Sequence, residues 1–213
     1  MNQLSVKQLL DKVREELKQK EEAKEETQKN MRKATRLSKQ AILLTHRGKF
    51  AEAKKLLIET NKLFTALTKL AQKHPELFYF GIVDAAFQEY AEAQILLSLI
   101  EKKRFISPEE LNVPSIDYVL GLADVIGELR RRALDMLRRG NVRTAEKCLE
   151  TMETIFSELT AMDDAYMLLP GLRRKCDIAR HVIESTRGDV TIETRRTFLE
   201  RSIKNLEKII TKK

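Results

Sequence analysis

The spacing of apolar residues along this chain predicts a protein built from long amphipathic helices. Apolar positions recur three and four residues apart over long stretches, which is the period of one face of a helix. Only 7 glycines and 4 prolines are present, so few turns and no strand are expected. The sequence therefore predicts an all-α fold, a seven-helix bundle of long antiparallel helices. The predicted helices cover residues 3–46, 51–73, 78–103, 115–139, 143–162, 170–186 and 191–210.

The first predicted helix is longer than a compact domain of this size needs. It contains neither Gly nor Pro, and at 1.5 Å per residue it would span roughly 60 Å. Leu9, Leu10, Val13 and Leu17 precede a charged stretch, KQKEEAKEETQKN, and the apolar positions resume at Met31. The charged middle is expected to be a solvated face or to line an assembly.

One segment of the chain is echoed at an offset of 92 residues. RLSKQAILLTHRGKFAEAKKLL, from Arg36, aligns with ELRRRALDMLRRGNVRTAEKCL, from Glu128. Each copy reads as a helix, a glycine-capped turn and a returning helix with a small alanine for close approach. The echo predicts two stacked antiparallel hairpins, and we interpret it as a packing solution and not as a functional motif.

Length and charge narrow the class of protein. A chain of 213 residues is long enough for a full core, and a single domain over residues 1–213 is expected. The net charge of +8 favours a polyanionic partner, with nucleic acid first, although a basic surface without such a partner fits the charge equally well. Cys148 and Cys176 show no CxxC spacing, and no apolar run reaches the length of a membrane span. These features predict a soluble, cytoplasmic protein with buried cysteines and no membrane partner.

Two acid pairs are the candidates for chemistry. Asp124 and Glu128 lie one helical turn apart on a stripe that also contains Asp117 and Asp135, and Glu89 and Glu92 are i,i+3 neighbours on another helix. Four converging carboxylates without histidine are a ligand set for Mg²⁺, with Mn²⁺ as a second candidate. Acid pairs at these spacings are also common on helices, where most are solvated or pair with Lys and Arg. Both interpretations stay open at this point.

Other sites are less well supported by the residues. His46, His74 and His181 have no metal-ligand spacing, and the absence of Glu-x-x-His in the sequence argues against a ferritin-like di-iron bundle. No Gly-rich phosphate loop and no Ser-His or Cys-His arrangement is visible. Arg32, Arg36 and Lys39 share one helix face suited to tracking phosphates, whereas the basic runs at 130–132, 138–139 and 173–175 are weak signals.

One stretch of sequence resembles a known family. IDYVLGLADVIGELRRRAL, from Ile116 to Leu134, resembles the signature of the translin and translin-associated factor X family, through its Asp-Tyr-x-x-Gly-x-x-Asp-x-x-Gly-Glu-Leu framework. FQEYAEAQIL, from Phe87, is similar to the preceding segment of the factor X branch, and ILLTHRG also fits. The chain lacks the long insertion before the fourth helix that is typical of eukaryotic members. It therefore resembles a compact, archaeal-type homologue over essentially its whole length.

The resemblance implies an all-helical protein that assembles into a hollow barrel and binds RNA or single-stranded DNA. The catalytic subunit of that family is a Mg²⁺-dependent endoribonuclease, and its acidic positions fall on Glu89, Glu92, Asp124 and Glu128. The presence of all four implies the catalytic branch. The basic RNA contacts of the family correspond to Arg32, Arg36, Lys39 and Arg47. A homo-octamer or similar homo-oligomer is implied, and the need for a second subunit type stays open.

The leading hypothesis from the sequence is a metal-dependent ribonuclease. Glu89, Glu92, Asp124 and Glu128 would hold Mg²⁺ in this account. A non-catalytic barrel that binds single-stranded RNA or DNA is the first alternative, with the acids paired to neighbouring cations. A helical protein-interaction scaffold is the second alternative.

Overall fold

The protein consists of helices joined by short connections. The computed structural model describes residues 5–162 and 166–211, and no strand occurs in these two ranges. The all-α prediction is confirmed. The chain divides into two compact units, Met1–Val113 and Pro114–Lys213, and each unit is described below by itself.

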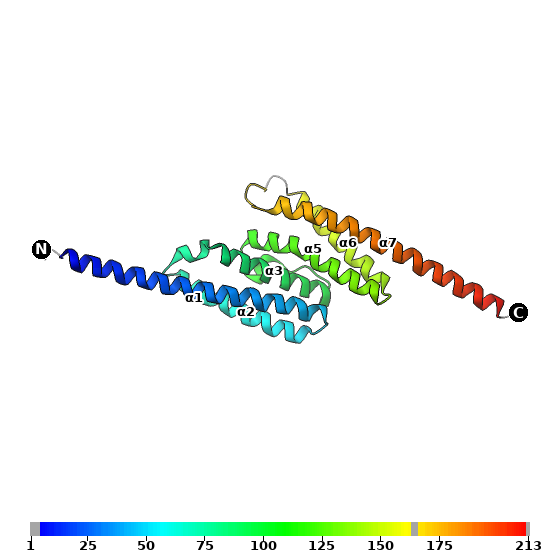
Figure 1. Cartoon of the computed structure of the whole chain (residues 1–213), viewed down its shortest axis with the longest axis horizontal. Helices are drawn as coiled ribbons and strands as arrows, with labels where there is room; N and C mark the ends of the chain where they lie inside the picture. Colours follow the sequence, from blue (N-terminus) through cyan, green and yellow to red (C-terminus); the bar gives the residue numbers. More distant parts are fainter. Residues whose placement is uncertain (1–4, 163–165, 212–213) are drawn as a thin grey trace. The chain divides into compact units, whose positions relative to one another are not determined.

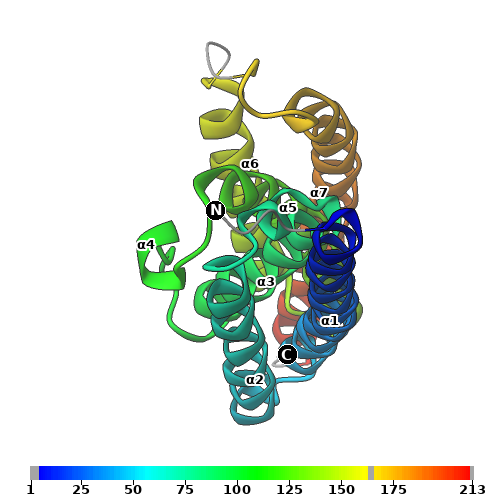
Figure 2. The ribbon, with the colours of Figure 1, turned by 90° about the vertical axis from the view of Figure 1, so that its left-hand side faces the viewer.

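Three long helices form the first unit. They are α1 (Val6–His46), α2 (Phe50–Ala71) and α3 (Gly81–Glu101), accompanied by the 3₁₀ helix η1 (Pro75–Tyr79) and the short α4 (Pro108–Leu111). Both α2 and α3 pack against α1, and Figure 2 shows these three helices grouped together with α4 set to one side. Met31 and Leu37 of α1, Leu57 and Leu67 of α2, and Ile95 of α3 are buried in the core. Small residues at the contacts, such as Ala41 and Ala53, let the backbones approach closely.

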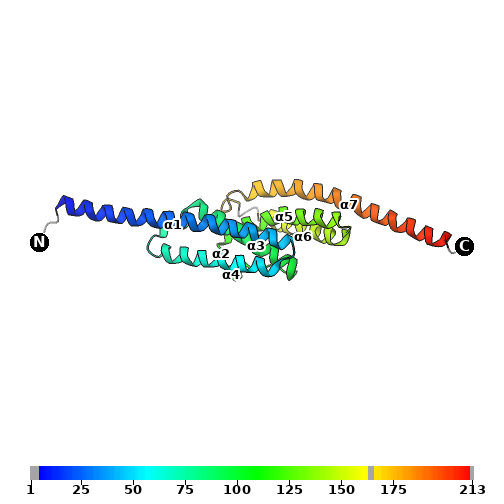
Figure 3. The same ribbon diagram turned by 60° about the horizontal axis from the view of Figure 1, so that its bottom comes forward.

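The N-terminal part of α1 extends beyond its neighbours in this unit (Figures 1 and 3). The helix begins with a capping box in which Ser5 and Gln8 bond each other's backbone N–H groups. Every residue from Ser5 to Glu22 is exposed, and an apolar stripe on this segment is exposed with them. The stripe consists of Val6, Leu9, Leu10, Val13 and Leu17.

The second unit also contains three long helices. They are α5 (Ser115–Arg138), α6 (Val142–Thr160) and α7 (Leu172–Ile210), and all three pairs of helices pack together. Ala133 of α5, Ala145 and Cys148 of α6, and Val190 of α7 form a buried cluster. Figures 1 and 3 show the C-terminal part of α7 running past the ends of α5 and α6. Its exposed apolar residues include Phe198, Leu199, Ile203, Leu206 and Ile209.

The two hairpins predicted from the internal echo are both present, and they use the same turn. Gly48 and Gly140 adopt positive φ values of 74° and 72°. The N–H of Gly48 bonds Thr45 and that of Lys49 bonds Leu44, while the N–H of Gly140 bonds Leu137 and that of Asn141 bonds Met136. This is the Schellman pattern in each case. The aligned alanines Ala53 and Ala145 are both fully buried. The echo therefore corresponds to a helical hairpin that is packed in the same way in each unit.

Alanine substitutions in the second unit test the role of the turn glycine. Gly140→Ala places a Cβ on a residue with φ of 72°, and we expect it to lower the free energy of unfolding by about 1–2 kcal/mol. Gly188→Ala is the matched control, because Gly188 lies inside α7 with no atom within 4 Å of an added Cβ. That control should raise stability by up to about 1 kcal/mol. Urea titration measures the stability of both variants. Equal effects of the two substitutions would contradict the role of Gly140 as a left-handed helix cap.

One predicted helix boundary is wrong. The sequence was interpreted as two helices separated by Arg187-Gly188-Asp189, but α7 is continuous from Leu172 to Ile210. Contacts with the other helices hold this stretch in place. Arg187 donates two hydrogen bonds to Glu153 of α6, at 3.1 and 2.6 Å, and Asp189 lies 3.4 Å from Arg130 of α5. A single glycine costs a helix about 1 kcal/mol, which is too little to end it when neighbouring residues are packed and paired.

Smaller differences from the prediction concern ends and turns. The connection around residues 106–115 contains α4, whose capping box joins Ser107 and Glu110 and whose C-cap Asn112 is left-handed. Together with the continuous α7, this short helix keeps the number of α-helices in the described ranges at seven. Gly127 of α5 is exposed, and apart from the backbone of its own helix nothing lies within 4 Å of an added Cβ. In the described part of the chain, no helix has the length and apolar character needed to cross a membrane.

Candidate functional site

The acid pair of the second unit lies on α5, and both members face a cation. Asp124 accepts hydrogen bonds from the Lys175 ammonium of α7, at 2.6 Å to Oδ1 and 2.5 Å to Oδ2. Glu128 lies 3.7 Å from Arg131, one turn further along α5. The side chains of Asp124 and Glu128 are 38% and 24% exposed. These carboxylates are therefore half-buried, reachable from solvent and electrostatically compensated.

Only the central two of the four acids in the stripe predicted on α5 are candidate metal ligands. Asp117 is buried at 4% exposure, and it lies in the first turn of α5. Asp135, at the other end, forms an i,i+3 ion pair with Arg138 at 3.4 Å. Asp124 and Glu128 are the central members of the stripe, and Asp124 is bonded by a cation from another helix.

The acid pair of the first unit lies on α3. Glu89 and Glu92 are both half-buried, and Glu89, with 18% of its side chain exposed, lies 3.7 Å from the Lys39 ammonium of α1. The residues between and beside them, Ala91 and Ala93, are fully buried and small. A carboxylate held in such a position loses solvation, which a nearby cation restores in part.

An aromatic cluster fixes the part of α3 that holds this pair. The rings of Phe64 and Phe87 stack with their centroids 4.2 Å apart, and Tyr90 meets Phe64 edge-on at 5.2 Å. Phe87 and Tyr90 flank Glu89 in the sequence, so this cluster sets the rotation of α3 about its axis at the acid pair. Burial raises the pKa of the Tyr90 phenol, and the hydrogen bond from Gln94 opposes this shift.

The donor atoms of the two pairs suit a hard divalent cation. All four side chains present carboxylate oxygens, which Mg²⁺ and Mn²⁺ prefer, and none is a histidine or cysteine. Within each unit, the described residues hold no group of three or more His, Cys, Asp or Glu side chains arranged to bind a metal ion. Neither pair alone therefore supplies three or more ligands for a metal ion.

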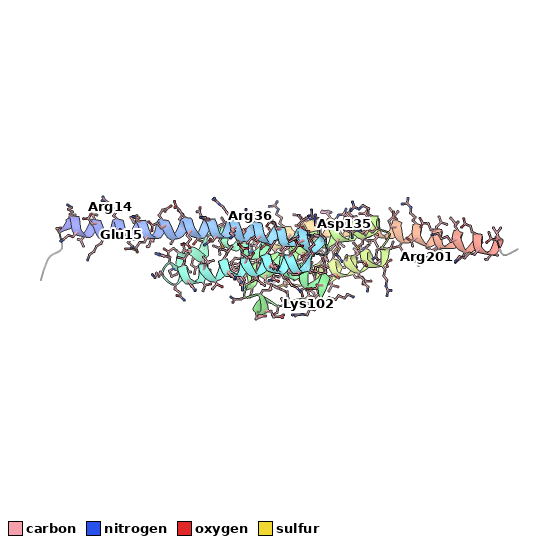
Figure 4. All side chains as sticks on the ribbon, turned by 90° about the horizontal axis from the view of Figure 1, so that it is seen from below. Arg14, Glu15, Arg36, Lys102, Asp135 and Arg201 are labelled. Atoms are coloured by element: carbon pink, nitrogen blue, oxygen red, sulfur yellow. The ribbon has the colours of Figure 1, made fainter. Side chains whose placement is uncertain are left out.

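The basic residues predicted to contact nucleic acid lie along α1. Arg32 and Arg36 are exposed and line a surface groove of about 600 Å³ together with Glu25, Gln28, Lys29 and Lys33. Figure 4 labels Arg36 on α1, in the part of the helix that packs against α2. Lys33 lies 2.7 Å from Glu59 of α2, and Arg47 is the exposed C-cap of α1.

Several residues in the basic runs of the second unit have structural partners. Arg130 donates a 2.8 Å hydrogen bond to Thr186 of α7 and lies 3.4 Å from Asp189. Arg131 and Arg138 lie beside Glu128 and Asp135, as described above. Lys175 is the residue that sequence reasoning missed, because it was placed in a basic run and its partner Asp124 is 51 residues away. The two cysteines are buried as predicted, and burial raises the pKa of each thiol.

Comparison with known proteins agrees with this architecture. An uncharacterized protein of Methanocaldococcus jannaschii is 32% identical over 193 residues, covering 90% of this chain and 85% of the relative. The structure of AfC3PO in complex with duplex RNA matches with a TM-score of 0.78 and 34% identity, over 88% of this chain and 97% of that one. The structure of apo-NeC3PO matches with a TM-score of 0.79 and 27% identity, over 91% of this chain and 100% of that one. Residues 22–208 match the Translin family. The chain is therefore a member of the Translin family.

Proposed function

We propose that this protein is a Mg²⁺-dependent endoribonuclease that acts on single-stranded RNA or on one strand of a nicked duplex. Membership of the Translin family supports nucleic-acid binding, and the similar AfC3PO has been solved with duplex RNA. The catalytic part of the proposal rests on the burial and the charged neighbours of the four acids. All are half-buried, they form one pair in each unit, and Glu89, Asp124 and Glu128 each lie beside a cation.

In this proposal Glu89, Glu92, Asp124 and Glu128 would hold the metal, and the chain would belong to the catalytic branch of the family. When bound, Mg²⁺ supplies a water of lowered pKa and stabilises negative charge on the phosphodiester. One carboxylate of the set orients the attacking water by accepting its hydrogen bond. The remaining carboxylates keep the cation in place, because each contributes an oxygen ligand and negative charge.

Arg32, Arg36, Lys39 and Arg47 of α1 are proposed to bind RNA phosphates. Arg32 and Arg36 are the best placed of these, because both are exposed and line the same groove. Lys39 lies near Glu89, so this cation connects the basic face of α1 with the acid pair of α3. Guanidinium groups bind phosphate oxygens through two parallel hydrogen bonds, which favours the arginines over the lysine as anchors.

The salt dependence of RNA binding tests whether Arg32 and Arg36 contact RNA phosphates. Removing Arg32 and Arg36 together should weaken binding and reduce the slope of log K against log salt by about 1.4, at about 0.7 for each lost contact with a single strand. Arg14→Ala is the control, because Arg14 is an exposed arginine on the same helix in the part that extends past α2 and α3 (Figure 4). Fluorescence anisotropy of labelled RNA gives the slopes. An unchanged slope in the double variant, or an equal change in Arg14→Ala, would contradict RNA binding by Arg32 and Arg36 of α1.

An oligomer is proposed on the basis of two exposed apolar stripes. One is on α1, from Val6 to Leu17, and the other is on α7, from Phe198 to Ile210. Exposed stripes at helical spacing on helix ends that extend past their own unit are typical of contact surfaces between subunits. We propose a homo-octamer or similar homo-oligomer. Light scattering should give a mass several times that of the 24.7 kDa chain, and a monomer at micromolar concentration would contradict this.

A second candidate function is RNA or single-stranded DNA binding without cleavage. The pairing of Asp124 with Lys175, and of Glu128 with Arg131, favours this candidate, because ion pairs alone already compensate these acids. A third candidate, a protein-interaction scaffold, predicts no RNA binding.

Incubation of labelled single-stranded RNA with the protein, in Mg²⁺ or in EDTA, separates these candidates. Cleavage that requires Mg²⁺ is expected. Cleavage that is unchanged in EDTA would exclude the metal-dependent mechanism, and binding without cleavage would support the second candidate.

A further inference from the structure

Lys175 occupies a distinctive position at the acid pair of the second unit. It lies in the first turn of α7, and its ammonium nitrogen is nearly equidistant from the two carboxylate oxygens of Asp124, at 2.6 and 2.5 Å. The two side chains are 26% and 38% exposed. The ammonium therefore bonds both oxygens of this carboxylate from a neighbouring helix.

Two further ion pairs involve the candidate acids. Lys39 and Glu89 are 3.7 Å apart, and so are Arg131 and Glu128. Those separations describe ion pairs without a close hydrogen bond. Lys175 bonds both oxygens of Asp124, so a metal at Asp124 would compete with it directly.

An ammonium and a divalent ion cannot use the same carboxylate lone pairs at the same time. Mg²⁺ binds oxygen at about 2.0–2.1 Å, and an ammonium held against both oxygens covers the face that the ion would approach. The two cations also repel each other. Lysine has a flexible four-carbon stem, so its ammonium can withdraw without a change in the backbone of α7.

We propose that Lys175 is a built-in competitor of the metal at Asp124 and that it sets the metal concentration at which the site fills. The lysine compensates the half-buried carboxylate while no metal is bound, and the incoming divalent ion displaces it. This inference rests on the proposed metal-dependent function, and it assigns to Lys175 a positioning role and not a catalytic one.

Metal binding can be measured without RNA or activity. Mn²⁺ binding to the full chain, followed by electron paramagnetic resonance, should be about fivefold tighter or more in Lys175→Met than in the unsubstituted protein. Lys147→Met is the charge-matched control, since it removes one exposed cation from α6, and its affinity should change less than about twofold. Lys175→Arg keeps a cation opposite Asp124 and should leave the affinity near that of the unsubstituted protein.

A further variant separates this inference from the proposed function. Asp124→Asn should abolish Mn²⁺ binding both alone and combined with Lys175→Met. If Asp124→Asn abolishes binding but Lys175→Met leaves the affinity unchanged or weaker, the competition is refuted and the metal site stands. An equal gain in Lys147→Met would also refute it, because the effect would then be one of net charge. If the unsubstituted protein and Lys175→Met both fail to bind Mn²⁺, the competition and the metal site fall together.

Discussion

Asp124→Asn should lower the rate of RNA cleavage by at least about 100-fold while leaving RNA affinity nearly unchanged. Loss of residues that merely support metal ligands typically costs 10- to 100-fold, so loss of a ligand is expected to cost at least as much. Asparagine has almost the same shape as aspartate, and its side-chain oxygen can still accept a hydrogen bond from Lys175. Single-turnover cleavage in Mg²⁺ gives the rate, and fluorescence anisotropy with the same RNA gives the affinity.

Asp135→Asn is the matched control for this substitution. Asp135, labelled in Figure 4, lies on the same helix and the same acid stripe and is also half-buried. It forms an ion pair with Arg138. It is not one of the four proposed ligands, so its removal should change cleavage less than about threefold. Equal loss in the two variants would mean that the stripe acts through its total charge. Full activity of Asp124→Asn would exclude this carboxylate from the site.

Phe64→Ala should lower the free energy of unfolding of the first unit by about 3–5 kcal/mol, the usual cost of removing a buried aromatic ring. Phe64 is 5% exposed, stacks on Phe87 and meets the edge of Tyr90. The ring lies on α2 and its two partners lie on α3. Its loss should therefore also loosen the acid pair at Glu89 and Glu92. Chemical denaturation followed by circular dichroism measures the change in stability.

Phe105→Ala serves as the control, because Phe105 belongs to the same unit but is 45% exposed. Its effect on stability should stay below about 1 kcal/mol. A Phe64→Ala variant that unfolds at the same denaturant concentration as Phe105→Ala would show that the aromatic cluster does not hold α2 and α3 together. A conservative Phe64→Leu variant, which keeps an apolar side chain, should recover part of the lost stability.

Sequence periodicity was sufficient to predict the helical class and most of the helix ends. Gly48 and Gly140 were assigned as caps from their places between apolar stretches, and both adopt the left-handed conformation that this role requires. The echo between the two hairpins was visible because close packing needs small residues at fixed positions, as at Ala53 and Ala145. Such features are local, so a single sequence contains the information that determines them.

The errors arose where long-range contacts outweigh local preference. Gly188 was interpreted as a break, yet the helix continues because Arg187 and Asp189 are held by residues of α6 and α5. The pairing of Lys175 with Asp124 was likewise invisible in the sequence, because these residues are 51 positions apart and belong to helices whose packing the pattern does not specify. Spacing along one helix placed Asp124 beside Glu128 and Glu89 beside Glu92. The proposal that the two pairs act together came from the family resemblance.

Metal binding by single variants of the four acids tests whether these carboxylates hold one metal ion together. We expect Glu89→Gln, Glu92→Gln, Asp124→Asn and Glu128→Gln each to weaken Mn²⁺ binding by at least about tenfold, because each removes one charged ligand of the proposed metal ion. Isothermal titration calorimetry on the correctly assembled protein, with Asp135→Asn as the control, gives the affinities. Mn²⁺ affinity that is unchanged in Glu89→Gln and Glu92→Gln would contradict the account, since the two pairs would then not form one site.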